Sequence, residues 1–138
     1  MGEGKVWLLF LFFLSYYVRS TGREIDFLNA TAPAGVAWIL SSSLKRLFKR
    51  PRPYQALNLP RPKAKYWNDS MPSSHAATTF AFAVTLLLMG HVLALPFVVW
   101  ATLVSFSRLY LGLHFMSDVF FGALLGTGVA FGIYNYIF

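Results

Sequence analysis

Long apolar runs, separated by one strongly basic stretch, constrain the fold of this chain most. Hydrophobic residues make up 57% of the 138 residues and charged residues only 12%, about half the charged fraction of an average soluble domain. The runs are continuous, unlike the short alternating segments of a transmembrane β-barrel. The sequence therefore predicts an all-α integral membrane bundle that forms one domain over residues 1–138.

Five apolar segments can be drawn, at residues 6–18, 27–47, 72–95, 96–113 and 116–138. We therefore expect about five transmembrane helices. The first segment is shorter than the about 20 residues that a full span needs, so we expect it to be tilted or partly interfacial. No small-residue cleavage site follows it cleanly, and we expect a retained first helix rather than a signal peptide.

Glycines recur at a spacing of four on the last segment, as Gly122 with Gly126 and Gly128 with Gly132. Such spacing lets two helices approach closely. We expect these glycines to serve packing within the bundle in preference to a dimer interface. The oligomeric state stays open.

The positive charge gathers around one proline-rich loop, at about residues 48–71. The basic residues of this region are Lys45, Arg46, Lys49, Arg50, Arg52, Arg61, Lys63 and Lys65. The loop is too polar for the bilayer core, so we expect an extended surface loop or a lid. A basic surface of this kind suits membrane lipid headgroups or a phosphorylated ligand. No nucleic-acid partner is predicted, because little soluble surface remains to bind one.

The remaining polar residues recur at the ends of segments. If the last four segments each cross the membrane, then these ends lie on the same side of it. The residues concerned are Lys45, Arg52, Ser73, Ser74, His75, Arg108, His114 and Asp118. We therefore expect one polar site at one face of the bundle.

The cations of this site suit a phosphate group. Lys45, Arg52 and Arg108 supply positive charge, and the planar fork of arginine matches phosphate oxygens. The helix that begins near Pro72 adds backbone N–H groups and the positive end of its dipole, while Ser73 and Ser74 add hydroxyl donors. A metal is disfavoured because Asp118 is the only well-placed carboxylate and the cations would repel the ion. No cofactor is predicted.

Two histidines supply candidate reactive groups. His114 and Asp118 are four residues apart and share one helix face. A hydrogen bond to Asp118 would fix the imidazole tautomer and leave its other nitrogen free to attack. His75, on the opposite wall, suits the proton donor to a leaving oxygen. His91 matches no motif, and we expect it to serve packing or hydrogen bonding.

The spacing of these residues resembles a known family. Three patterns carry the resemblance: Lys45-x6-Arg52-Pro53, Pro72-Ser73-Ser74-His75, and Ser107-Arg108-x5-His114-x3-Asp118. They closely resemble the signature motifs of the type 2 phosphatidic acid phosphatase (PAP2) superfamily, which includes membrane lipid phosphatases, acid phosphatases and vanadium haloperoxidases. The resemblance spans residues 45–118, a little over half of the chain.

The resemblance implies a role for each matching residue. His114 is similar to the nucleophile that forms a phosphohistidine, Asp118 to its orienting carboxylate, and His75 to the general acid. The implied phosphate-binding set is Lys45, Arg52, Ser73 and Arg108, together with the backbone near Ser74. Ser74 departs from the family pattern, which usually has glycine there and so lets the backbone approach phosphate closely.

Residues outside the motifs receive more general interpretations. Only Arg52 has the family's spacing from Lys45, although Arg50 precedes a proline in the same way. We expect the other basic residues of the region, Arg46, Lys49, Arg50, Arg61, Lys63 and Lys65, to serve as headgroup contacts or topology signals. Asp69 and Ser70 are expected to cap the helix that follows them.

The predicted activity is metal-independent hydrolysis of a lipid phosphate monoester or diphosphate. The substrates implied by the resemblance are phosphatidylglycerol phosphate, undecaprenyl diphosphate or a lipid A phosphate. Phosphotransfer to another lipid, or a non-catalytic module that binds anionic lipids, are the alternatives. A haloperoxidase is disfavoured because the family members with that activity are soluble.

The predicted location is the cell membrane of a bacterium or archaeon. Clustered lysines and arginines place the site on the cytoplasmic face by the positive-inside rule. The resemblance instead implies the outer face. Because phosphate and headgroup binding explain the charges, we expect the outer face.

Overall fold

The computed structural model describes residues 16, 19–20, 22–58, 60 and 69–137. Its helices are α2 (Glu24–Phe48), α3 (Pro53–Ala56), α4 (Ser74–Leu88), α5 (Ala94–Tyr110) and α6 (Met116–Ile137). That part of the chain contains no strand, which confirms the predicted all-α class. The predicted segment at 6–18 lies outside the described residues except for Tyr16, as does most of the basic loop after α3.

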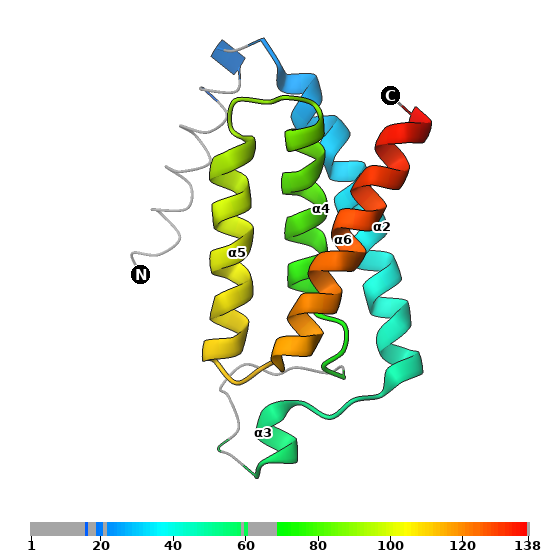
Figure 1. Cartoon of the computed structure of the whole chain (residues 1–138), viewed down its shortest axis with the longest axis vertical. Helices are drawn as coiled ribbons and strands as arrows, with labels where there is room; N and C mark the ends of the chain where they lie inside the picture. The colour runs from blue at the N-terminus through cyan, green and yellow to red at the C-terminus, as the bar shows by residue number, and fades with distance from the viewer. Residues whose placement is uncertain (1–15, 17–18, 21, 59, 61–68, 138) are drawn as a thin grey trace.

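Helix α4 is the centre of the bundle, because it packs against α2, α5 and α6. Helices α5 and α6 touch each other little. Figure 1 shows that the turn between α4 and α5 lies at one end of the bundle. The end of α2, the short α3, the start of α4 and the α5–α6 connection lie at the opposite end. The predicted convergence of segment ends at one face is therefore confirmed.

Helix α4 ends earlier than predicted, at Leu88 instead of residue 95. Gly90 adopts a left-handed conformation with φ 62°. The backbone N–H groups of Gly90 and His91 donate to the carbonyls of Leu87 at 3.0 Å and Leu86 at 2.9 Å. These two bonds form a glycine-dependent helix stop that reverses the chain. Helix α5 then begins at Ala94.

Small side chains lie inside the bundle and large ones outside. Ala76, Ala77 and Ala81 of α4 are 0% exposed. By contrast, Trp38 of α2 and Leu103 of α5 are 57% and 61% exposed. Lipid tails solvate large apolar side chains, and helices in lipid associate through small residues that allow close contact. This distribution is typical of a bundle surrounded by lipid.

The two glycine pairs of α6 have different surroundings. A Cβ added at Gly122 would lie 2.5 Å from the Ser73 carbonyl oxygen, and one at Gly126 would overlap the Ala77 carbonyl. At Gly128 and Gly132 an added Cβ would meet nothing within 4 Å. Only the first pair therefore brings α6 against α4, as expected for packing within the bundle.

His91 lies in the turn between α4 and α5 and is 3% exposed. Its Nδ1 accepts a hydrogen bond of 3.1 Å from the Leu93 backbone N–H. Its ring packs edge-to-face on Phe27, with centroids 5.1 Å apart. The expectation of a packing and hydrogen-bonding role for His91 is confirmed.

Candidate active site

Five helix ends and one connection bring the predicted residues to the same end of the bundle (Figure 1). Lys45 lies in the last turn of α2, Arg52 caps α3, and Ser73 caps α4. Ser74 and His75 open α4, Arg108 lies in the last turn of α5, His114 lies in the α5–α6 connection, and Asp118 lies in the first turn of α6.

Gly112 determines how the chain enters the site after α5. Its φ of 63° is left-handed, a conformation that glycine adopts at little cost. The N–H groups of Gly112 and Leu113 donate to the carbonyls of Leu109 at 2.9 Å and Arg108 at 3.1 Å. Arg52 Nη1 then donates to the Leu113 carbonyl at 3.1 Å. The turn therefore delivers the next residue, His114, into the bundle, where it is 4% exposed.

Asp118 is the point where several segments are joined. Its side chain is fully buried. Oδ2 accepts a hydrogen bond of 2.8 Å from the Phe115 N–H, and Oδ1 accepts one of 2.8 Å from Arg50 Nη1. Its backbone carbonyl accepts a bond of 2.9 Å from the Ser73 N–H. Asp118 thus connects α6 to the start of α4 and to the segment after α2.

The predicted hydrogen bond between His114 and Asp118 is not formed. His114 Nδ1 lies 3.7 Å from Asp118 Oδ2, beyond hydrogen-bond distance. This Nδ1 has no hydrogen-bond partner among the described residues. The carboxylate instead bonds to Phe115 and Arg50. Bonds of this kind are often long without substrate and tighten when it binds.

Arg50 lies in the site, although its sequence position had indicated only a headgroup contact or a topology signal. Besides Asp118, its Nη1 donates to Ser117 Oγ at 2.7 Å. Its guanidinium carbon lies 4.2 Å from the centre of the Phe115 ring, within the range of a cation–π contact. Its position two residues before Arg52 could have indicated a place in the site, because alternate residues of an extended segment point to the same side.

Positive charge in the site exceeds negative charge. Lys45 and Arg52 are 6% and 4% exposed. Among the described residues, the ion pairs of Asp118 are with Arg50 and, at a longer distance, His114. Lys45 has no carboxylate within ion-pair distance in that part of the chain. A buried cation without a counter-charge is costly, so an anion bound here would stabilise the site.

The same surroundings keep His114 neutral. Burial lowers the pKa of His114 to about 3, and the positive charges of Arg52 and Lys45 act in the same direction. Because the lowered pKa favours the free base, the ring is uncharged throughout the neutral pH range. A neutral imidazole has the lone pair that a nucleophile needs.

The start of α4 differs from the expectation in its cap. Ser73 is the N-cap, and its Oγ accepts from the Ala76 N–H at 3.5 Å. The prediction that Asp69 and Ser70 cap this helix is wrong. The Ser70 N–H donates instead to the Arg50 carbonyl at 2.8 Å, and its hydroxyl reaches the carbonyls of Arg50 and Pro51. Ser70 thereby holds the start of the basic loop against its end.

The fold of this chain is that of a known helical bundle. It matches the crystal structure of a transmembrane PAP2-type phosphatidylglycerolphosphate phosphatase from Bacillus subtilis with a TM-score of 0.63 and 23% identity. The match covers 99% of this chain and 70% of that one. The PAP2 superfamily model matches residues 23–138, and the chain therefore belongs to the PAP2 superfamily. The resemblance found in the sequence is confirmed.

Two curated relatives illustrate the family. A decaprenylphosphoryl-5-phosphoribose phosphatase of Mycobacterium tuberculosis is 40% identical over 111 residues, which is 78% of this chain and 59% of that protein. An undecaprenyl-diphosphatase of Sulfolobus acidocaldarius is 36% identical over 105 residues, 70% of this chain and 48% of that protein. The chain thus spans roughly half to three fifths of the length of these relatives.

Proposed function

We propose that this protein hydrolyses a lipid phosphate monoester or diphosphate through a phosphohistidine on His114. The observation that carries the proposal is a neutral, buried histidine surrounded by cations that exceed the nearby carboxylates. Such a site attracts a phosphate and presents a nucleophile to it. The names of the relatives, which are phosphatases of phosphorylated lipids, support the same activity.

A location in the membrane is part of this proposal. Residues Met116–Tyr136 of α6 are long and apolar enough to cross a membrane, and α4 and α5 are shorter apolar helices. The large apolar side chains on the bundle surface support the same location. We propose the cell membrane of a bacterium or archaeon, with the site on its outer face.

The proposed reaction proceeds in two displacements. The imidazole nitrogen of His114 that faces away from Asp118, Nε2, attacks phosphorus while the bond to the leaving oxygen breaks. His75, in the first turn of α4, gives its proton to that oxygen. Water then attacks the phosphohistidine, His75 takes a proton from the water, and inorganic phosphate leaves. Lys45, Arg52 and Arg108 stabilise the charge on the three equatorial oxygens, together with N–H groups at the start of α4.

Asp118 and Arg50 orient the nucleophile in this scheme. The ring of His114 becomes positive when phosphorus is attacked, and a carboxylate 3.7 Å away stabilises that charge. The Phe115 N–H and Arg50 hold the carboxylate in place. Arg50 acts through Asp118 and is therefore a positioning residue.

Replacing Arg50 with alanine should lower kcat about 10- to 100-fold, the effect seen when partners that orient metal-bound histidines are removed. The KM should change much less, because Arg50 is already bonded to Asp118 and Ser117. Arg50→Lys should restore part of kcat, since it keeps the charge but not the fork. Steady-state kinetics of the purified variants measure both parameters.

Arg46→Ala is the matched control, because it removes one exposed cation from the last turn of α2. It should leave kcat near that of the unmodified protein. Equal effects of Arg46→Ala and Arg50→Ala would reduce Arg50 to a contributor of general surface charge. A purely structural role would lower the thermal midpoint of Arg50→Ala without the kcat-specific loss or its rescue by lysine.

Release of inorganic phosphate from a set of lipid phosphates tests the proposed function. The set contains phosphatidylglycerol phosphate, undecaprenyl diphosphate, a lipid A phosphate and a polyprenyl-linked sugar phosphate. We expect hydrolysis of at least one of them to persist in excess chelator, because the site's cations take the place of a metal. Vanadate should inhibit. No phosphate release from any of them, or a strict need for magnesium, would contradict the proposal.

A further inference from the structure

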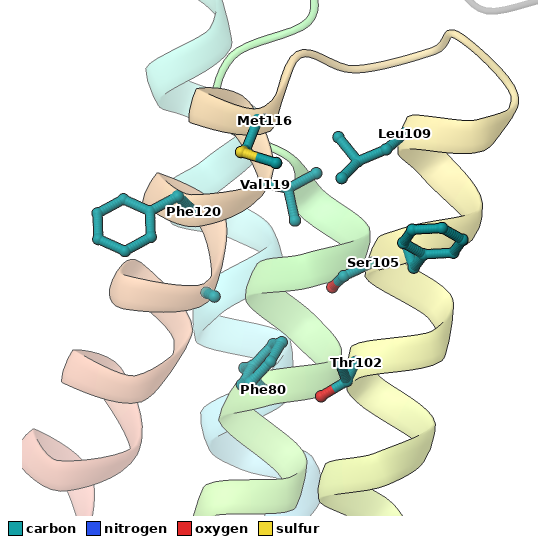
Figure 2. A pocket seen from close by; sticks show the side chains of 9 residues that line it. Phe80, Thr102, Ser105, Leu109, Met116, Val119 and Phe120 are labelled. Carbon is teal, nitrogen blue, oxygen red and sulfur yellow. The ribbon is translucent and has the colours of Figure 1, made fainter.

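An apolar groove opens beside the site, between α5 and α6. Its volume is about 300 Å³. Figure 2 shows that α5 and α6 form its two walls and that Phe80 of α4 lies at its floor. The groove exists because α5 and α6 both pack on α4 but scarcely on each other.

One end of the groove lies at the active site. Leu109, next to Arg108, and Met116 and Val119, near His114 and Asp118, line this end (Figure 2). A lipid whose phosphate is bound by Arg108 would therefore have its next atoms at the mouth of the groove. The lining of the groove therefore begins one residue from Arg108 and Asp118 along the chain.

Ser105 is the exception in the lining. It is 5% exposed, and its Oγ has no hydrogen-bond partner among the described residues. The other lining hydroxyl, that of Thr102, donates to the Val98 carbonyl at 2.9 Å. Figure 2 shows the Ser105 side chain pointing from α5 into the space between the helices. A buried hydroxyl without a partner is costly, so a ligand acceptor in the groove would satisfy it.

The position of Ser105 indicates which part of a lipid it meets. It precedes Arg108 by three residues on α5, which is a rise of about 4.5 Å along the same helix face. In a glycerolipid phosphate, the first acyl ester follows the phosphate after a short carbon link, and its carbonyl is a strong acceptor. In a polyprenyl phosphate the hydrocarbon begins directly after the phosphate and offers no acceptor. A sugar phosphate carries several polar groups that this apolar groove cannot pair.

We infer that the α5–α6 groove binds an acyl chain of a glycerolipid phosphate, with Ser105 Oγ donating to its ester carbonyl. This inference rests on the proposed phosphatase function and names its substrate class. A second apolar groove of about 470 Å³ lies between α2 and α6 and includes Leu124. Its lining has no hydroxyl, so nothing there distinguishes a substrate from bulk lipid.

Paired substrates test the hydrogen bond. Diacylglycerol phosphate and the dialkyl ether analogue have the same chains but differ in the ester carbonyl. We expect the unmodified protein to prefer the diacyl form in kcat/KM by about threefold to tenfold, the factor of one hydrogen bond. Ser105→Ala should remove this preference, while the matched serine variant Ser43→Ala, on the exposed side of α2, should retain it. A preference that survives Ser105→Ala would overturn the assignment of the carbonyl to Ser105.

Filling the groove tests where the chain binds. Ala123 of α6 lines the groove, and Ala123→Phe should lower kcat/KM for the diacyl substrate about tenfold relative to a water-soluble aryl phosphate, as expected when a few methylenes lose their contact. Leu103→Phe, on the 61% exposed face of α5, should leave that ratio unchanged. An unchanged ratio in Ala123→Phe, or a loss seen only in Leu124→Phe of the second groove, would overturn the inference.

The soluble substrate separates the two proposals. If the protein cleaves the aryl phosphate while the groove variants leave lipid selectivity unaltered, only the groove assignment fails. If it cleaves neither substrate class, the proposed function fails and the inference with it. Similar losses for both substrates in Ser105→Ala would show that this residue acts on the phosphate site and would overturn its role in chain binding.

Discussion

Replacing His114 with alanine should abolish phosphate release, with a loss of at least about 10⁴-fold in kcat, the scale on which removal of a covalent nucleophile acts. The reason is that the described part of the chain offers no second buried, neutral imidazole at this end of the bundle, since His75 is exposed on α4 and His91 lies at the other end. Acid-labile phosphate on the protein, measured after rapid quenching with labelled substrate, should disappear in the same variant.

His91→Ala is the matched control, because it also removes a buried histidine. His91 packs on Phe27 and bonds to Leu93, so its loss should lower the thermal midpoint but leave kcat of the folded protein nearly unchanged. His75→Ala should also lose most of its turnover, since the leaving oxygen then lacks its proton donor and the water step its base, but it keeps the nucleophile and should still form some phosphorylated protein. Turnover by His114→Ala near the unmodified rate would refute the nucleophile assignment.

Much of the site could be predicted because its residues lie at helix ends. The order of apolar segments determines which ends share a side, so Lys45, Arg108 and Asp118 had to meet once the last four segments were taken as antiparallel helices. The spacing of the motifs then matched a family whose model covers residues 23–138. Long apolar periodic segments are the most dependable signals in a sequence.

Details that depend on contacts between segments far apart in the sequence could not be predicted. Arg50 and Asp118 are 68 residues apart, and their bond follows from how the segment after α2 folds against α6. The cap of α4 is Ser73 and not Ser70, because Ser70 is used to hold the backbone at Arg50. In both cases several polar residues could have served, and packing selected among them.

The same limit applies to the glycines of α6. Their sequence spacing is identical, yet only Gly122 and Gly126 face α4. A helix of about 3.6 residues per turn places residues four apart on one face, but the sequence does not tell which face meets the neighbour. The distinction becomes visible only from the position of α4.

Replacing Gly126 with alanine should destabilise the bundle by about 1 to 3 kcal/mol or more, the usual cost of overpacking a tight interior. The added Cβ would overlap the Ala77 carbonyl, which is backbone of α4 and cannot rotate away. The two helices must therefore separate. Because the Ser73 N–H bonds to the Asp118 carbonyl at 2.9 Å, that separation should also displace the start of α4 from His114 and lower kcat.

Gly128→Ala makes the same chemical change on the same helix, but its Cβ would meet nothing within 4 Å. It should be neutral or stabilising by up to about 1 kcal/mol, because alanine favours a helix more than glycine does. Denaturation of the purified variants in one detergent, followed by tryptophan fluorescence, measures the difference between them. Equal midpoints would mean that α6 does not approach α4 as closely as the structure shows. A loss of both stability and kcat in Gly126→Ala, with neither loss in Gly128→Ala, would establish that this contact sets both the stability of the bundle and the alignment of its two catalytic walls.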